Sequence, residues 1–160
     1  MDEFIYLDSC VILSFLKDEP DRADRVRDCL SNAQAGIIPA RLITSVMTIA
    51  EVSWVISEES GDVLPLQVID DFWNDAPIHF YEVNTAHAHR ARDLMRNRLS
   101  APRPNPDFNI RRRSIDVLHL ATAITIGAKA FWTFDVKDFQ NYQADGIEIM
   151  EPEPVQPTLL

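Results

Sequence analysis

The feature that most constrains the fold is a short apolar run near the start of the chain that stops at a carboxylate. Phe4-Ile5-Tyr6-Leu7 is apolar at every position, and Asp8 follows it directly. A strand with one solvated face alternates between apolar and polar residues, whereas a strand buried on both faces does not. The run therefore predicts a fully buried strand of the kind found in parallel sheets.

Further short strands along the chain are separated by segments with helical spacing. Strands are predicted at 42–44, 78–83, 130–133 and 147–150, and helices at 11–16, 21–30, 46–54, 64–73, 85–99 and 115–126. The predicted caps are Asp21, Ser45, Asn84 or Thr85, and Ser114, with Gly127 ending the last helix. Strands that alternate with helices predict an α/β fold, a three-layer α/β/α sandwich around a mainly parallel sheet.

Length and composition favour one globular unit. The 160 residues are 46% hydrophobic and 25% charged, which is ordinary for a folded domain. We expect a single domain over residues 1–150 and a proline-containing tail over 151–160. No leader peptide or membrane span is visible, and Cys10 and Cys29 fit no paired spacing. These features indicate free thiols, a cytoplasmic location and no membrane partner.

Acidic residues gather where a parallel sheet places its ligands. Asp8 follows the first strand, Asp135 follows a later one, and Asp138 lies one turn beyond it. Glu51 and Asp116 lie inside otherwise apolar helical runs. An acid in the first turn of a helix also complements the helix dipole, and this explanation suffices for Asp116 alone. Four acids that converge make a stronger case than any one of them.

Converging carboxylates repel one another unless a cation lies between them. Hard oxygen ligands suit Mg²⁺ or Mn²⁺ rather than zinc. The formal charge of the chain is −10, but residues 86–113 hold eight arginines against two acids. This segment can contact a polyanion while the acids hold a cation. The residues thus predict metal-assisted hydrolysis of a phosphodiester.

Four runs together resemble the acidic motifs of PIN-domain ribonucleases, and the toxin subunits of VapBC toxin–antitoxin pairs are the most similar type. The runs are Tyr6-Leu7-Asp8-Ser9, the stretch from Ser45 to Val52, the stretch from Asp116 to Ala123, and the stretch from Thr133 to Phe139. They occur in the order and at the intervals usual for that family. The resemblance covers nearly the whole chain.

The resemblance implies an Mg²⁺- or Mn²⁺-dependent endoribonuclease that cuts transfer RNA or another structured RNA, with a cognate antitoxin partner and a homodimer. By position, Asp8, Glu51, Asp116 and Asp135 are the acidic quartet, with Asp8 and Asp116 as direct metal ligands. Glu51 and Asp135 ligate directly or through water, or orient the attacking water. Ser9 and Thr133 are hydroxyls that position carboxylates, and Asp138 either joins the site or caps the following helix.

One position departs from the family pattern. Cys10 stands where the family commonly has asparagine two residues after the first aspartate. A thiol is a weak hydrogen-bond donor and a soft ligand. The alternative function is therefore a degenerate PIN module that binds RNA or a protein without cutting. A phosphatase of the haloacid-dehalogenase type ranks last, because it needs an aspartate at position 10.

Other residues have two interpretations each. Arg111, Arg112 and Arg113 either contact RNA phosphates beside the site or form a solvated basic turn. His119, three residues after Asp116, is more readily a partly buried packing residue than a metal ligand, and His87 and His89 are expected at the surface. Trp54, Phe72 and Trp73 belong either to the core or to an exposed groove that the resemblance associates with dimer or antitoxin contacts.

Overall fold

The computed structural model describes residues 3–59, 66–100, 114–142 and 146–154, and every two successive strands are separated by one or two helices. The strands are β1 (Glu3–Leu7), β2 (Ala40–Ser45), β3 (Ile78–Tyr81), β4 (Ala130–Trp132) and β5 (Glu148–Met150). The helices are α1 (Ser9–Leu16), α2 (Arg22–Gln34), α3 (Met47–Glu59), α4 (Leu66–Asp75), α5 (Thr85–Ser100), α6 (Ser114–Thr125) and α7 (Val136–Phe139).

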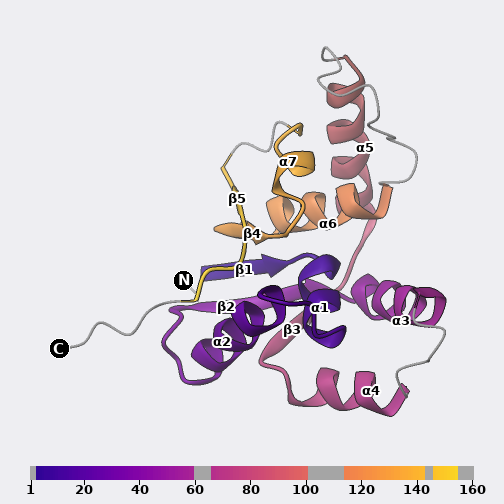
Figure 1. The fold of residues 1–160 in the computed structure, drawn as a ribbon. Helices are drawn as coiled ribbons and strands as arrows, with labels where there is room; N and C mark the ends of the chain where they lie inside the picture. Colours follow the sequence, from indigo (N-terminus) through magenta and orange to yellow (C-terminus); the bar gives the residue numbers. More distant parts are fainter. Residues whose placement is uncertain (1–2, 60–65, 101–113, 143–145, 155–160) are drawn as a thin grey trace.

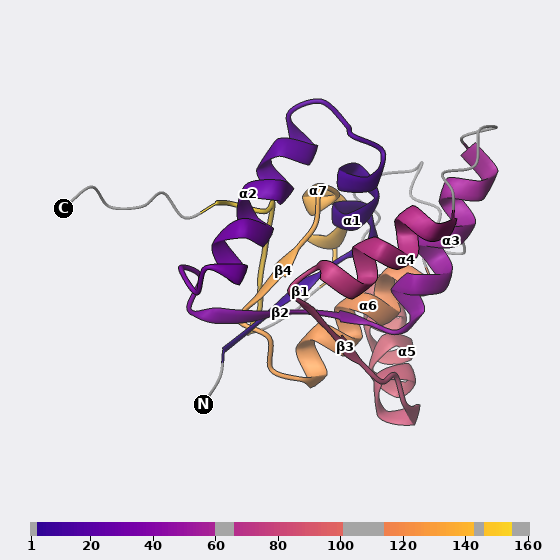
Figure 2. The same ribbon diagram turned by 90° about the horizontal axis from the view of Figure 1, so that it is seen from below.

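The five strands form one sheet in the order β3-β2-β1-β4-β5, and every neighbouring pair is parallel. The apolar run at the start of the chain is the central strand, with Ile5 paired to Leu42 on one side and to Ala130 on the other. Figures 1 and 2 show helices α5, α6 and α7 on one side of this sheet and α1 and α2 on the other. The predicted three-layer sandwich around a parallel sheet is confirmed.

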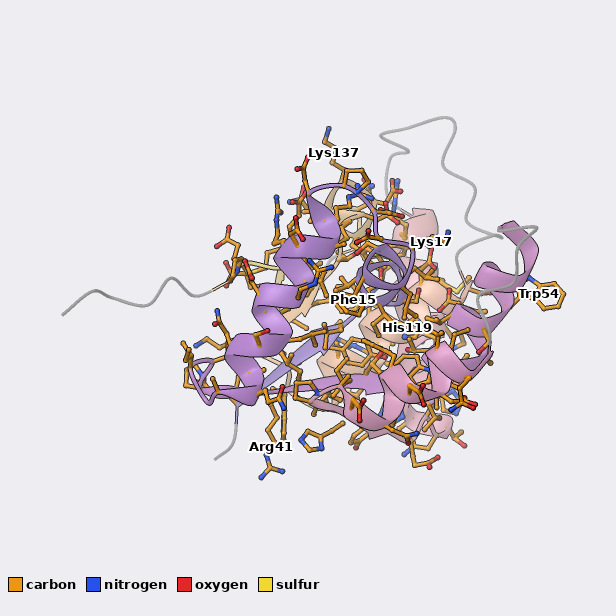
Figure 3. All side chains as sticks on the ribbon, turned by 60° about the horizontal axis from the view of Figure 1, so that its bottom comes forward. Phe15, Lys17, Arg41, Trp54, His119 and Lys137 are labelled. Carbon is orange, nitrogen blue, oxygen red and sulfur yellow. The ribbon has the colours of Figure 1, made fainter. Side chains whose placement is uncertain are left out.

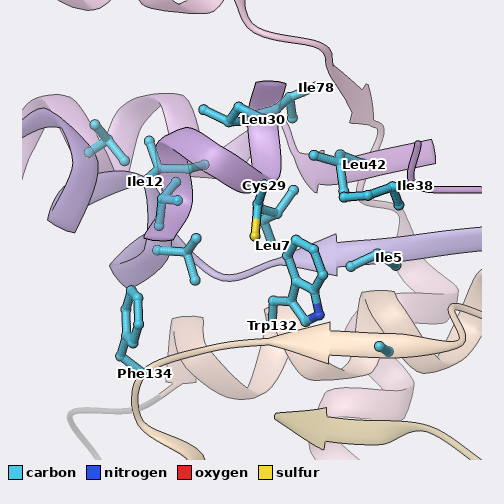
Figure 4. Close-up of a cluster of buried hydrophobic side chains, with 14 of the residues drawn as sticks. Ile5, Leu7, Ile12, Cys29, Leu30, Ile38, Leu42, Ile78, Trp132 and Phe134 are labelled. Atoms are coloured by element: carbon cyan, nitrogen blue, oxygen red, sulfur yellow. The ribbon is translucent and has the colours of Figure 1, made fainter. Parts of the chain in front are cut away.

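Alternate residues of the central strands face opposite layers, which gives two apolar cores. Ile5 and Leu7 pack with Leu42 and Trp132 in the core beneath α1 and α2, which Figure 4 shows in close-up. Tyr6, between them in sequence, packs in the other core. Because the strand is buried on both faces, apolar side chains are favoured at both sets of positions, and this explains the continuous apolar run.

The second core lies beneath α5, α6 and α7, and stacked aromatic rings fill it. Tyr6 and Phe131 stack with their ring centroids 5.6 Å apart, and Phe139 of α7 tilts against Phe131 at 4.8 Å. The helix α6 supplies the small and branched partners, among them Val117, Leu120 and Ala121. This packing fixes α6, and hence the residues of its first turn, against the central strand.

Some local expectations differ from the structure. Asp21 precedes α2 as predicted, but its side chain makes no capping hydrogen bond and its φ is 64°. Asn84 does cap α5, because its Oδ1 accepts from the backbone N–H of Ala86. The prediction for His87 was wrong: it is 1% exposed, its ring packs edge-on against Tyr81, and its Nδ1 accepts from the N–H of Asn84.

Part of the predicted tail is ordered against the domain. Pro152 is buried, and Glu151 pairs with Arg25 of α2 at 2.5 Å. The boundary between a domain over 1–150 and its tail stays a prediction. Within the described ranges no helix combines the length and the apolar character needed to cross a membrane.

A threonine joins the first two strands and the helix that follows them. The Oγ1 of Thr44 donates to the carbonyl of Leu7 at 2.8 Å and lies 2.7 Å from the Oγ1 of Thr48. Since the single hydroxyl proton of Thr44 goes to Leu7, Thr48 must donate to Thr44. Both threonines have no exposed surface. These bonds set where α3 begins relative to the end of β1.

We predict that Thr44→Val lowers the free energy of unfolding by about 1–3 kcal/mol, because it leaves a buried carbonyl and a buried hydroxyl without their partner. Urea unfolding of both proteins measures the change. Thr125→Val is the matched control: Thr125 also donates to a backbone carbonyl, that of Ala121, but the residue is exposed. Equal changes in the two variants would contradict the importance assigned to Thr44.

Candidate functional site

The carboxylate of Asp8 lies at the carboxyl end of the central strand and is 3% exposed. Its Oδ1 accepts from the backbone N–H of Ser9 at 2.9 Å, and its Oδ2 accepts from Cys10 Sγ at 3.1 Å and from Thr133 Oγ1 at 2.8 Å. Each carboxylate oxygen has about two acceptor positions. Among the described residues, Oδ2 is therefore fully used, and one position of Oδ1 remains open.

Thr133 connects two of the predicted acids. Its hydroxyl donates to Asp8, and the same oxygen accepts from the backbone N–H of Asp135 at 3.1 Å. Asp135 itself is exposed and precedes α7 without a side-chain capping bond. Asp138 lies in α7, one turn further on, and is half-buried. The turn after β4 is thus anchored to Asp8 through one threonine.

Cys10 makes more polar contacts than the weak polarity of a thiol suggests. Besides Asp8 Oδ2, its Sγ lies 3.3 Å from Thr133 Oγ1 and accepts from the backbone N–H of Phe134 at 3.3 Å. Burial, and after it the charge of Asp8, raises the pKa of the Cys10 thiol well above its ordinary value. The side chain consequently stays a thiol and can donate to Asp8.

The carboxylate of Glu51 approaches the same edge of the sheet from α3. Its Oε2 lies 2.9 Å from His119 Nε2, and its side chain is 19% exposed against 2% for His119. Burial lowers the pKa of His119, but the hydrogen bond that its ring donates to Glu51 and the charges of Asp8, Glu51 and Asp116 together raise it above its ordinary value. The imidazole is therefore within electrostatic reach of three of the four predicted acids.

The structure thus relates the predicted residues to different degrees. The negative charges of Asp8, Glu51 and Asp116 all raise the pKa of His119. Asp116 lies half-buried in the first turn of α6. Asp135 is linked to Asp8 only through the Thr133 hydroxyl and its own backbone. Ser9 contacts Asp8 through its backbone N–H. The three arginines predicted to bind RNA, Arg111, Arg112 and Arg113, lie outside the described residues.

The donors present fit a hard divalent cation that is completed by water and substrate. In the part of the chain that the structure describes, no three His, Cys, Asp or Glu side chains form a ready metal cage. Mg²⁺ is commonly held by only one or two carboxylates together with water and phosphate oxygens. The open position of Asp8 Oδ1 and the charge repulsion between Asp8 and Glu51 fit such a site.

The aromatic residues of α3 and α4 divide between the two interpretations left open. Phe72 and Trp73 are partly buried and pack against the core beneath α1 and α2. Trp54 is 68% exposed and points away from α3, as Figure 3 shows. His119, labelled near the centre of the same view, is 2% exposed. Trp54 is therefore a surface residue, whereas Phe72 and Trp73 contribute to the core.

Tyr6 is a polar contact of the site that the sequence analysis did not single out. Its hydroxyl lies 2.8 Å from His119 Nδ1, and the tyrosine has no exposed surface. Burial raises the pKa of Tyr6 well above its ordinary value, so that it stays a phenol. The alternation of the strand, with Tyr6 facing α6 between two residues that face α1, is the signal that could have placed it there.

A family model described as PIN domain matches residues 5–144 of the chain. No curated protein matches the sequence of this chain. The match of the family model spans β1 to α7, including all four of the predicted acids. The resemblance noted from the four acidic runs is confirmed at the level of the family.

Several solved bacterial structures have a similar fold. A DNA-bound VapBC from Salmonella typhimurium is 17% identical with a TM-score of 0.64, and the match covers 94% of this chain and 98% of that chain. A toxin–antitoxin complex from Klebsiella pneumoniae is 13% identical with a TM-score of 0.57, covering 94% and 99%. VapC20 of Mycobacterium tuberculosis, a toxin that cleaves the sarcin–ricin loop, is 12% identical with a TM-score of 0.59, covering 85% and 92%.

The burial of Asp8 makes a prediction about stability. Burial, only partly opposed by the charge of His119 and the hydrogen bonds from Cys10 and Thr133, raises the pKa of Asp8 above its ordinary value of 3.8. The folded state then holds this proton at pH values where the unfolded chain has lost it. Stability must therefore fall as the pH rises from about the ordinary pKa through the raised one.

We predict that Asp8→Asn, measured in chelator, raises the Tm at pH 7 by a few degrees and that this gain shrinks as the pH falls toward 4. Thermal unfolding followed by circular dichroism across this range checks it. Asp28→Asn, at an exposed position of α2, is the control and should leave the Tm unchanged. A lower Tm for Asp8→Asn at pH 7 would mean that the hydrogen bonds outweigh the burial of the charge.

Proposed function

Because the chain belongs to the PIN domain family, we propose that it is a nuclease, and specifically a metal-dependent endoribonuclease toxin of a type II toxin–antitoxin pair. It hydrolyses RNA phosphodiester bonds in the cytoplasm with Mg²⁺ or Mn²⁺. The observation that carries the proposal is the buried carboxylate of Asp8, held at the end of the central strand within electrostatic reach of Glu51. Two like charges held near one another lower the stability of a protein. Such a pair is therefore typical of a functional site that binds a cation.

In this proposal Asp8 and Asp116 are the direct metal ligands, and Glu51 and Asp135 complete the site directly or through water. A bound divalent cation would supply charge stabilisation for the phosphoryl group and a lower pKa for an attacking water. Thr133 and Cys10 hold Asp8 Oδ2, so that Oδ1 is the oxygen that Asp8 presents. The backbone N–H of Ser9 fixes the direction of that oxygen.

The structural neighbours support a proposed antitoxin partner, and the family resemblance suggests the other proposed partners. The Klebsiella pneumoniae neighbour is a toxin–antitoxin complex, and the Salmonella typhimurium neighbour is a VapBC bound to DNA. We extend this to a cognate antitoxin for the present chain. The homodimer that we also propose is what the family resemblance suggests. The RNA substrate is a structured RNA, with transfer RNA among the candidates.

Cleavage of transfer RNA and total RNA by the purified protein, free of any partner, tests the activity. We expect cutting with Mn²⁺ or Mg²⁺, none in chelator, and a loss of roughly 10²–10³-fold in Asp8→Asn and in Asp116→Asn, the size typical of removing a transition-state stabiliser. Asp28→Asn is the matched control and should cut like the wild type. RNA that is bound but never cut would favour the alternative function, a binding module whose metal site has decayed.

The basic segment supplies a second test, on RNA affinity instead of cutting. Replacing Arg111, Arg112 and Arg113 with alanine should weaken binding and flatten its salt dependence, with about 0.7 to 0.9 units of log–log slope lost per phosphate contact. Binding titrations at several salt concentrations with Asp8→Asn, which prevents cutting, give the slopes. Arg22→Ala, which removes a surface arginine outside residues 86–113 that is paired with Glu19 at 3.1 Å, is the control. An unchanged slope in the triple variant would place the RNA path elsewhere.

A further inference from the structure

The imidazole of His119 connects elements that lie far apart in the sequence. Its Nδ1 lies 2.8 Å from the hydroxyl of Tyr6 on β1 and 3.4 Å from the Oγ of Ser45 on β2, and its Nε2 lies 2.9 Å from Glu51 Oε2 on α3. His119 itself belongs to α6. Both ring nitrogens thus have polar partners inside the protein, as the burial of a polar ring requires, and one of these partners is a predicted site residue, Glu51.

The chemistry of the partners fixes the direction of these hydrogen bonds. A carboxylate only accepts, so Nε2 carries a hydrogen and donates to Glu51. In the neutral imidazole Nδ1 then accepts from the Tyr6 hydroxyl, and in the imidazolium it donates to the same oxygen. The bond from Nε2 to Glu51 is common to both states, so its role does not depend on the protonation of the ring.

The bond uses one oxygen of Glu51 and leaves the other available. Oε2 faces His119, and Oε1 has no hydrogen-bond partner among the described residues. A glutamate with three rotatable bonds on a partly exposed helix would otherwise sample many rotamers. The imidazole of His119 is 2% exposed and packs against Tyr6 with the ring centroids 5.9 Å apart, so it cannot move along with the glutamate side chain. The hydrogen bond to His119 therefore restricts the carboxylate of Glu51 to a position where it interacts with the charge of Asp8. The charge of Asp116 acts on the same imidazole.

We propose that His119 is a positioning residue that holds the Glu51 carboxylate beside Asp8, with Tyr6 fixing the orientation of the imidazole. The proposal rests on the proposed function, since it assigns Glu51 to the metal site of the nuclease. The sequence favours a packing histidine, and the hydrogen bonds of both ring nitrogens add a polar role. The contact would deliver one oxygen of Glu51, Oε1, to a cation or to a water.

Nitrogen-15 NMR of the histidine side chains tests the contact without any activity. The chain has four histidines, and His87 is a matched control, because it is also buried and its Nδ1 also accepts a hydrogen bond, from the N–H of Asn84. In chelator we expect a slowly exchanging Nε2–H for His119 that shifts in Glu51→Gln, and an Nδ1 resonance that shifts in Tyr6→Phe. The resonances of His87 should not move. An unshifted His119 in Glu51→Gln would overturn the proposal.

Binding of Mn²⁺, measured by calorimetry, tests the consequence. His119→Phe keeps the ring volume but loses the donor, and we expect roughly 10-fold weaker binding or more, the usual effect of removing a group that orients a ligand. His119→Gln keeps an N–H donor and should recover part of the affinity, whereas a residue that only packs would tolerate phenylalanine better than glutamine. Folded His119→Phe that binds Mn²⁺ like the wild type would overturn the proposal.

The two experiments separate this proposal from the proposed function. A wild-type protein that binds no Mn²⁺ and cuts no RNA would remove the metal-dependent nuclease, while the NMR shifts still decide whether His119 holds Glu51. Conversely, metal-dependent cutting together with an unshifted His119 in Glu51→Gln would keep the nuclease and remove the positioning role. If His119→Phe does not fold, Tyr6→Phe, which removes one hydroxyl, gives the same comparison with a milder change.

Discussion

Burying one carboxylate at the end of the central strand is the constraint on which the arrangement of the site depends. Removing Asp8 from water is unfavourable unless donors from the protein replace the lost hydration. Those donors come from both sides of the strand end: the first residues of α1 supply Ser9 and Cys10, and the residue after β4 supplies Thr133. The position of α1 and that of the turn after β4 are therefore set by the same group that is proposed to do the chemistry.

The parallel sheet explains why these groups meet at all. Since β1 pairs with β2 on one side and β4 on the other, the ends of three consecutive strands of the sheet lie together at one edge. Groups far apart in the sequence consequently meet at this edge. Thr44, near the end of β2, contacts Leu7, which is 37 residues away, and Thr133, after β4, contacts Asp8, which is 125 residues away. Changing any one strand end would displace groups contributed by the others.

Much of the fold could be predicted from the sequence, because local patterns carry it. The apolar run before Asp8 and the helical spacing of the longer segments are short-range signals. The helix α7 was missed because four residues are too few to show a period. His87 was misplaced at the surface because its polarity gives no hint that the ring of Tyr81 and the N–H of Asn84 enclose it.

The site was predictable only in part, for a physical reason. Carboxylates at strand ends can be recognised one at a time, but the contact between Tyr6 and His119 joins residues 113 positions apart and depends on how α6 packs on β1. The weak polarity of a thiol likewise suggested little for Cys10, yet burial keeps it protonated and leaves it a donor to Asp8. A cysteine at this position is therefore compatible with an oriented carboxylate: what the site requires of residue 10 is a hydrogen directed at Oδ2, and either an amide or a thiol can supply one.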